Sequence, residues 1–310
     1  MKCLIVQPVH EEGLELLRQN GIEPVICPDP SMDTVAALAP GCESCITRNA
    51  GFTEQAFAAA DKLKVVVVHG AGHDAVDKES ATRHGVLVCN TPGANAQSVS
   101  ELALGLALSA ARLLPAADRE ERAGRFGFRD RNQTLELQGK TALVVGWGHT
   151  GSRLGEMLRG ALDMRVLVHS PSVKDLGDFE RASSLEAGLA EADLISLHTP
   201  LRPETRHMIN KDSLALVKPG AILVNTARAG LVDEAALLDA LDKRHLFAAG
   251  LDVYEEDAPL GALGRSDRVI LAPHLGGATE EAMRRIAVAS VENVLTALSG
   301  KRPATALNLD

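Results

Sequence analysis

Apolar residues come in short unbroken runs along the chain, and polar or helix-like stretches separate these runs. Four runs in the N-terminal part predict strands, at 3–9, 44–48, 63–70 and 85–90. Residues 11–20 predict a helix that Gly21 ends. Unbroken apolar runs are typical of parallel strands that are buried on both faces. Their alternation with helices favours a parallel sheet that is covered by helices.

The same alternation restarts after Gly139. Six further runs predict strands, at 141–146, 165–170, 192–200, 221–227, 248–253 and 268–274. Residues 280–299 predict a last helix. Six parallel strands with intervening helices suit a doubly wound domain. The chain is therefore expected to be an α/β protein with two doubly wound parallel-sheet domains.

The segment between the two blocks predicts one long helix at 98–114. Ser98 and Glu101 have the spacing of a capping box, S-x-x-E, which predicts the start of the helix. The helix is apolar nearly all round, so it is expected to be buried between domains or against another subunit. Residues 115–139 are charged and predict irregular structure.

Composition narrows the classes of protein to which the chain can belong. Hydrophobic residues make up 45% of the 310 residues, which indicates a globular protein. The net charge is −9 with scattered basic residues, so neither nucleic acid nor an anionic membrane surface is an expected partner. No run approaches the ~20 apolar residues of a membrane span, and no signal peptide is recognisable. We expect a soluble, cytoplasmic protein.

Cysteine spacing leaves two interpretations open. Cys42 and Cys45 form C-x-x-C, which fits redox chemistry or half a zinc site. No second ligand pair follows, although a zinc site normally needs four ligands. Reduced, structural thiols are therefore the preferred interpretation, and no metal is expected.

Three glycines, Gly146, Gly148 and Gly151, spell G-x-G-x-x-G between a predicted strand and a predicted helix. This context predicts dinucleotide binding. The first glycine makes the tight turn, the second lets the backbone approach a pyrophosphate, and the third lets helix and strand pack closely. The free N–H groups of the helix start then face the phosphates.

The acid that usually holds the ribose about 20 residues further on is absent. The next strand ends instead in His169, Ser170, Pro171 and Ser172. Because an acid there repels a 2′-phosphate, its absence predicts that NADP is accepted, alongside NAD, with Ser170 at the cofactor.

Polar residues at the ends of the later predicted strands are the candidate catalytic and binding residues, because ligands bind beyond the carboxyl ends of parallel strands. They are Thr199, Arg228, Asp252, Asp257 and His274. The guanidinium of Arg228 matches a carboxylate, although a surface salt bridge is the common alternative. A lone histidine is usually structural, but a carboxylate at Asp257 that holds one ring nitrogen makes His274 a candidate acid–base group.

Five segments in order, "GWGHTG", "LHTPLRPETRHMIN", "LVNTARAGLVDE", "AGLDVYEED" and "PHLGGAT", resemble the D-isomer-specific 2-hydroxyacid dehydrogenases. The similarity covers roughly residues 3–308. It implies a Rossmann cofactor domain at 98–279. It also implies a flavodoxin-like substrate domain split between 1–97 and 280–310.

The resemblance also implies roles for single residues. Arg228 matches the arginine that grips the substrate, and His274 matches the acid–base histidine. Asp252 looks like the residue that binds the nicotinamide carboxamide. The loop at 70–74 resembles the one whose N–H groups, at Ala71 and Gly72, hold the substrate carboxylate. Arg48 resembles a substrate-domain arginine. Further implied cofactor contacts are Ala71, His149, Thr150, Thr199, Thr226, Ala227, Arg228, His274, Gly276 and Gly277.

Three positions depart from the family pattern. The partner of the histidine is usually Glu, whereas Asp257 is one methylene shorter, and Glu256 is the neighbouring alternative. The acid expected near Ser170 is missing, and Ala229 replaces a frequent second glycine.

The resemblance implies hydride transfer between NAD(P) and a small D-2-hydroxyacid of the hydroxypyruvate, glyoxylate or 3-phosphoglycerate type. It also implies a homodimer formed through the helix at 98–114. A corepressor-like, nucleotide-sensing protein is the alternative, but sensing alone needs no Arg228, His274 or acid at 257. A methyltransferase with a similar glycine loop leaves the same three residues unexplained.

Overall fold

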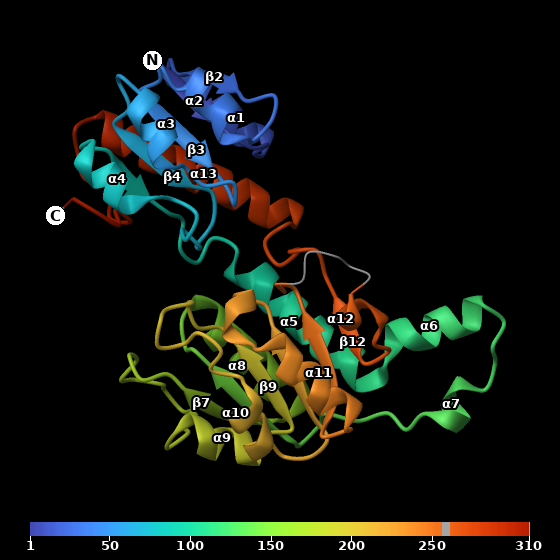
Figure 1. Ribbon diagram of the computed structural model, residues 1–310. Coiled ribbons are helices and arrows are strands. Elements are labelled where there is room, and N and C mark those ends of the chain that lie inside the picture. The colour runs from blue at the N-terminus through green and yellow to red at the C-terminus, as the bar shows by residue number, and fades with distance from the viewer. Residues whose placement is uncertain (256–260, 310) are drawn as a thin grey trace. The chain divides into compact units, whose positions relative to one another are not determined.

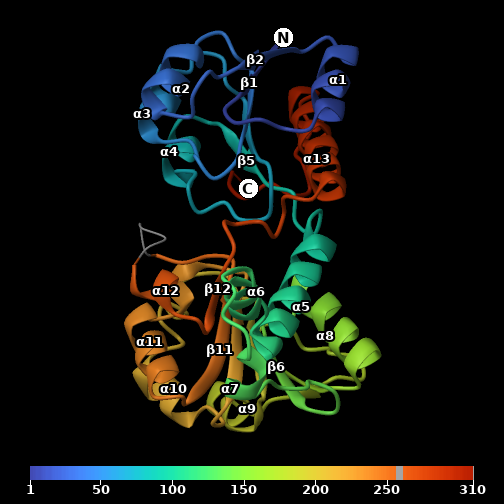
Figure 2. The ribbon, with the colours of Figure 1, turned by 90° about the vertical axis from the view of Figure 1, so that its right-hand side faces the viewer.

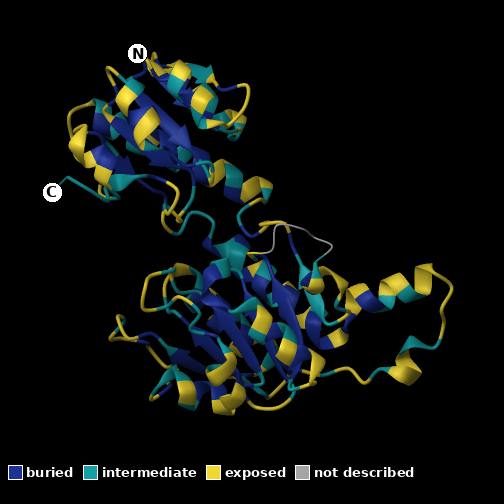
Figure 3. Cartoon of the chain, viewed as in Figure 1, coloured by how far each residue is buried: buried dark blue, intermediate teal, exposed yellow. Residues whose placement is uncertain are grey.

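The computed structural model describes residues 1–255 and 261–309, which divide into two compact units (Figure 1). Unit 1 comprises Met1–Ala96 and Gly277–Asp310, and unit 2 comprises Gln97–Gly276. Buried residues concentrate on the strands of each unit, while the exposed ones lie on helices and loops (Figure 3). The chain thus builds two separate hydrophobic cores around two sheets.

Unit 1 contains a sheet of five parallel strands in the order β2-β1-β3-β4-β5. The strands are β1 (Lys2–Ile5), β2 (Glu23–Ile26), β3 (Ser44–Thr47), β4 (Val65–Val68) and β5 (Leu87–Cys89). This is the flavodoxin-like strand order. The predicted flavodoxin-like sheet is confirmed. β2 is not among the predicted strands, because its four residues, EPVI, include a charge and a proline and are only partly buried.

Helices cover both faces of this sheet (Figure 2). One face carries α1 (Glu11–Gln19) and α13 (Glu280–Leu298), and the other carries α2 (Met32–Leu38), α3 (Glu54–Ala59) and α4 (Lys78–Arg83). Gly13 lets α1 and α13 pack closely, because a Cβ there would lie 2.9 Å from the Cβ of Ala287. Gly21, with φ +70°, follows α1, as the sequence predicts.

Unit 2 contains a sheet of seven parallel strands in the order β8-β7-β6-β9-β10-β11-β12. The strands are β6 (Thr141–Val145), β7 (Arg165–His169), β8 (Glu180–Arg181), β9 (Leu194–Leu197), β10 (Ala221–Asn225), β11 (Leu246–Leu251) and β12 (Val269–Leu271). Counted from β6, this is the Rossmann order 3-2-1-4-5-6 with one further strand. The predicted fold class is confirmed, and the two-residue strand β8 is an addition to the six predicted strands.

Two helices, α5 (Ala96–Arg112) and α8 (His149–Leu162), cover one face of this sheet (Figure 2). The other face carries α9 (Leu185–Glu191), α10 (Lys211–Leu216) and α11 (Glu234–Asp242), with the short helix α12 (Ala262–Arg265) beside them. The alanine-rich side of α5 packs into the core of unit 2. Its opposite side exposes Glu101, Leu108 and Arg112.

The capping box predicted at Ser98 is wrong. The helix begins at Ala96, because a turn with hydrogen bonds from Ala94 N to Thr91 O (3.4 Å) and from Ala96 N to Gly93 O (3.1 Å) leads directly into it. Ser98 therefore lies inside the helix rather than at its cap.

The prediction of irregular structure over 115–139 is also wrong in part. Two helices, α6 (Leu114–Arg122) and α7 (Phe128–Arg131), lie there and reach away from the sheet of unit 2 (Figure 1). They show little apolar periodicity because few of their residues are buried. Local features mark α6 instead, namely a proline in its first turn and an Asp118–Arg122 pair at 2.8 Å.

Within the described ranges, no single helix has both the length and the apolar character needed to cross a membrane. The pair α5 and α6 meets that test only jointly, and it is bent by 59°.

Candidate active site

The glycine turn joins β6 to α8, and its geometry requires glycine at two positions. Gly146 has φ +98°, and a Cβ there would lie 2.5 Å from the carbonyl oxygen of His198. A Cβ at Gly151 would lie 2.0 Å from the oxygen of Gly146, so α8 can approach the turn only with glycine there. The turn is therefore held between the end of β9 and the first turn of α8.

The start of α8 has the features of an anion site. Gly148 is the N-cap residue, and no side chain caps the helix among the described residues. The space around a Cβ at Gly148 is open within 4 Å, and His149 is exposed. In addition, the hydroxyl oxygen of Thr226 is buried without a hydrogen-bond partner in the described part of the chain. Free helix N–H groups, open space and an orphaned hydroxyl fit a dinucleotide.

Arg228 lies three residues beyond the end of β10, in a loop that the Asn225 side chain holds. Asn225 Oδ1 accepts a hydrogen bond from Ala227 N (3.0 Å), and Asn225 Nδ2 donates to Arg228 O (2.8 Å). The Arg228 guanidinium donates from Nη1 to Ala227 O (2.7 Å). The sequence analysis missed Asn225, although a polar residue that ends the apolar run AILVN is the signal that marks it.

His274 lies three residues beyond β12 with φ +56°, and its side chain is exposed. The buried side chain of Asp252 fixes the two residues that follow His274. One carboxylate oxygen accepts from Leu275 N (2.6 Å), and the other accepts from Gly276 N (2.9 Å). Burial raises the pKa of Asp252, while these N–H groups and the nearby His274 act in the opposite direction. Asp252 therefore holds the main chain around His274.

Main-chain hydrogen bonds tie the three strand ends together. Asp252 N donates to Asn225 O (2.9 Å), and His274 N donates to Asp252 O (3.1 Å). Because β10, β11 and β12 are neighbours in the sheet, Arg228, Asp252 and His274 come to adjacent positions at its carboxyl edge. Asp257 and the neighbouring Glu256 lie outside the described residues.

The other predicted cofactor residues of unit 2 lie at the same edge. Thr199 follows β9, and its N atom would lie 2.8 Å from a Cβ on Gly146. Thr150 and Ala227 are partly buried, and Ser170 and Gly276 are buried. Gly277 belongs to unit 1, where a Cβ would lie 2.8 Å from Asn95 Nδ2.

Unit 1 places Arg48, Ala71 and Gly72 at the carboxyl edge of its own sheet. Arg48 follows β3, is partly buried and donates to Pro8 O (3.1 Å). Ala71 and Gly72 are exposed in the loop after β4. Their N–H groups have no hydrogen-bond partner among residues 1–255 and 261–309, as a loop that holds a carboxylate requires.

His69, which the sequence did not point to, lies beside Arg48. His69 N donates to Thr47 O (2.7 Å), the residue before Arg48, and the His69 side chain is 7% exposed. Its Nε2 has no partner in the described part of the chain. Burial, and next the charge of Arg48, lower the pKa of His69 to about 4, so the imidazole is neutral at pH 7.

His198, behind the glycine turn, carries a pH-dependent share of stability. Ser196 Oγ and His198 Nε2 are 2.8 Å apart, and burial lowers the pKa of His198 from 6.5 to about 4. The unfolded chain therefore binds a proton that the folded chain excludes. Proton binding by the unfolded chain therefore costs the fold nothing well above pH 6.5, and it destabilises the fold increasingly as the pH falls from 6.5 toward 4.

We expect acidification to pH 5 to cost about 2 kcal/mol at this residue. Thermal unfolding of the wild type and of His198→Asn at pH 7 and pH 5 measures the effect. The variant should lose less stability on acidification than the wild type. Equal losses in both proteins contradict the assignment.

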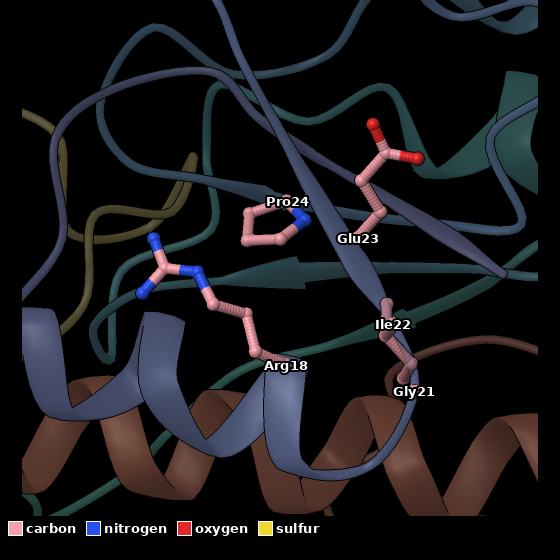
Figure 4. Close-up of a pocket in the computed structure, with 5 residues that line it drawn as sticks. All are labelled: Arg18, Gly21, Ile22, Glu23 and Pro24. Carbon is pink, nitrogen blue, oxygen red and sulfur yellow. The ribbon is translucent and has the colours of Figure 1, made fainter.

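A shallow surface hollow lies at the turn between α1 and β2, lined by Arg18, Gly21, Ile22, Glu23 and Pro24 (Figure 4). It is at the amino end of β2, whereas ligands in parallel sheets bind at the carboxyl ends. The hollow includes none of the candidate residues and plays no part in the site.

All five cysteines are buried free thiols. Burial raises the pKa of Cys3 to about 12 and that of Cys89 to about 11, so these two thiols are protonated and unreactive at neutral pH. Cys42 and Cys45 belong to the hydrophobic core of unit 1. The structural interpretation of the C-x-x-C pair therefore holds better than the redox one.

Comparison with known proteins gives the same family as the motifs. The family model for the NAD-binding domain of D-isomer specific 2-hydroxyacid dehydrogenases matches residues 104–276. D-3-phosphoglycerate dehydrogenase of Archaeoglobus fulgidus is 34% identical over the whole chain, which spans only 59% of that relative's length. Hydroxypyruvate reductase of Thermotoga maritima is 34% identical over 94% of this chain and 96% of its own.

Among solved structures, the TT0316 protein from Thermus thermophilus superimposes with a TM-score of 0.91 at 33% identity. The superposition covers 99% of this chain and 100% of that one. Sequence motifs, fold and relatives agree. The chain belongs to the D-isomer specific 2-hydroxyacid dehydrogenase family.

Proposed function

We propose that this protein transfers hydride between NAD(P) and a small D-2-hydroxyacid or 2-oxoacid of the hydroxypyruvate, glyoxylate or 3-phosphoglycerate type. One observation carries the proposal. The glycine turn, Arg228 and His274 all lie at the carboxyl edge of the same seven-stranded sheet. Relatives of the family that are named as a dehydrogenase and a reductase support it, and no relative reported above supports the corepressor-like alternative.

We assign the cofactor to the predicted domain at 98–279, most of which is unit 2. We assign the substrate chiefly to the predicted domain at 1–97 and 280–310, which lies in unit 1. The N–H groups at the start of α8, together with Thr199 and Thr226, hold the dinucleotide. When bound, its nicotinamide exchanges a hydride with carbon 2 of the acid. Asp252 accepts from the carboxamide while it holds the loop after His274.

His274 handles the proton. In reduction the protonated imidazole gives its proton to the carbonyl oxygen, and in oxidation the neutral imidazole takes the hydroxyl proton. Positioned acid–base groups contribute about 10²–10⁴-fold to rates. We assign Asp257, which lies outside the described residues, to the role of the carboxylate partner of His274 that the sequence predicts.

Arg228 and the loop of unit 1 bind the acid. Two parallel donors of the guanidinium match a carboxylate, and they also polarise the adjacent carbonyl. The N–H groups of Ala71 and Gly72 bind the carboxylate, and Arg48 meets a polar or phosphorylated group at the far end of the substrate.

Absorbance at 340 nm tests the proposal. Purified protein is mixed with NADH or NADPH and with glyoxylate, hydroxypyruvate or 3-phosphohydroxypyruvate. We expect oxidation of the cofactor with at least one of these acids. A protein that binds the dinucleotide but turns over none of them contradicts the proposed activity.

We also propose a homodimer and a reducing, cytoplasmic setting. Three apolar side chains in the segment from α5 to α7 are exposed, Leu108 by 39%, Leu114 by 53% and Phe126 by 72%, and such side chains favour a partner surface. Sedimentation equilibrium should give a dimer, and Phe126→Asp should shift it toward monomer. A wild-type monomer at every concentration contradicts this proposal.

The free thiols are typical of a reducing compartment.

A further inference from the structure

The loop that follows β7 is held by one arginine from the next strand. Arg181 Nη1 donates to Ser170 O (3.0 Å), and Nη2 donates to Val173 O (2.6 Å) and Lys174 O (3.0 Å). These three carbonyls span the whole turn after the strand. The guanidinium therefore fixes the shape of the segment in which the usual ribose-binding acid is missing.

Strand pairing puts this guanidinium at the correct edge of the sheet. Arg181 on β8 pairs with Val168 on β7, and Ala182 N donates to Val168 O (2.9 Å). The side chain must extend past His169 to reach Ser170 O. Its cationic end thus lies beyond the carboxyl end of β7, where a dinucleotide fold binds the adenosine ribose.

The charge of Arg181 is not neutralised within the described residues. All of its hydrogen bonds go to main-chain carbonyls, no carboxylate pairs with it, and the residue is exposed. Arg165, on the neighbouring strand, is the contrast, because Glu180 (2.5 Å) and Glu191 (2.6 Å) both pair with it. Five N–H donors allow Arg181 to hold the loop and still reach a ligand.

Neither of the titratable groups His169 and Glu186 forms an ion pair with Arg181 in the described residues. Burial lowers the pKa of His169, and the positive charge of Arg181 acts in the same direction. Glu186, which acts electrostatically on His169, interacts with Ser184 and with its own N–H at the start of α9, and these hydrogen bonds lower its pKa. Glu186 therefore remains ionised, but no ion pair joins it to Arg181 in the described part of the chain, and the arginine keeps free donors.

We propose that Arg181 selects NADP(H) over NAD(H) by binding the 2′-phosphate while it clamps the loop 170–174. The selection rests on the proposed nicotinamide cofactor site, but not on which acid is the substrate. Arg181 takes the place that a ribose-binding acid has in NAD-specific proteins, and it reverses the sign of the charge there. The missing acid and the added arginine both favour NADP(H) over NAD(H).

Binding measurements test the proposal without turnover. Isothermal titration calorimetry gives the Kd of NADPH, NADH, 2′,5′-ADP and 5′-AMP for the wild type, Arg181→Gln and the matched control Arg165→Gln. We expect the wild type to bind 2′,5′-ADP more tightly than 5′-AMP, and NADPH more tightly than NADH. In Arg181→Gln that preference should fall by about 10- to 100-fold, because NADPH loses much more affinity than NADH. Arg165→Gln should keep the preference.

Three results overturn the assignment. The assignment is overturned if the wild type binds NADPH no better than NADH. The proposed dehydrogenase activity still holds in that case if the wild type turns over a 2-oxoacid with NADH. An equal loss of both cofactors in Arg181→Gln shows that the arginine only holds the loop. An unchanged preference for NADPH in Arg181→Gln shows that other residues select the cofactor. Circular dichroism melting checks that each variant is folded before its Kd is compared.

Discussion

Replacing His274 with alanine is expected to lower kcat by about 10²–10⁴-fold, the usual contribution of a positioned acid–base group. The Kd of the cofactor should remain nearly unchanged, because Asp252 and the glycine turn, rather than the imidazole, shape the dinucleotide site. Stopped-flow measurement of hydride transfer gives the rate, and quenching of protein fluorescence gives the Kd.

The backbone at His274 determines the best control. Its φ of +56° is in the left-handed region, where alanine is strained and asparagine is tolerated. His274→Asn therefore removes the acid–base group without straining the loop, and it should lose as much kcat as the alanine variant. A loss of less than about tenfold in His274→Asn removes His274 from the proton-transfer role.

Replacing Arg228 with glutamine is expected to lower kcat/KM by about 30- to 5000-fold, which corresponds to the ~2–5 kcal/mol lost when a buried, hydrogen-bonded charge pair loses one partner. Arg228→Lys should recover only part of it, since lysine keeps the charge but not the two parallel donors. Steady-state kinetics with varied 2-oxoacid, and the Ki of oxalate, measure the effect on both rate and binding.

Arg206 offers a matched control for this substitution. It also lies against the loop after β10, where its Nη1 would be 3.1 Å from a Cβ on Gly230, but it pairs with Glu255 at 3.6 Å. Arg206→Gln should leave kcat/KM nearly unchanged. Equal losses in the two glutamine variants indicate that general loop disruption, not carboxylate recognition, explains the result at Arg228.

Much of the fold was predictable because strands buried on both faces consist of unbroken apolar runs. β4 is VVVV and β10 is AILVN, and such short runs are typical of buried parallel strands. The glycine turn was equally predictable. A Cβ at Gly146 or Gly151 would clash with main-chain atoms, so only glycine fits at these two positions. These features can be recognised in short stretches of the sequence.

Two of the four edge strands, β2 and β8, and the helices α6 and α7 were not predictable in the same way. β2 and β8 lie at the edges of their sheets, so one side of each needs no apolar residue. α6 and α7 bury little, and in α6 Asp118 pairs with Arg122 along the helix instead. Hydrophobic patterning indicates burial, and these segments have few buried residues.

The candidate site was predictable in its residue types but not in its supporting contacts. Arg228 and His274 follow strands that the apolar runs predict. That Asn225 holds one loop, Asp252 the other and Arg181 a third depends on hydrogen bonds to main-chain atoms 2 to 24 positions away. Composition does not indicate such pairings, because the acceptor or donor is a peptide group that every residue shares.

A crystal structure of the protein with NADP⁺ and oxalate tests the central claim most directly. We expect the oxalate to lie with one carboxylate on the Arg228 guanidinium and within hydrogen-bond distance of the His274 imidazole, against the nicotinamide ring. The pyrophosphate should lie on the N–H groups that follow Gly148. Oxalate bound away from both side chains, or a dinucleotide bound away from the glycine turn, contradicts the account.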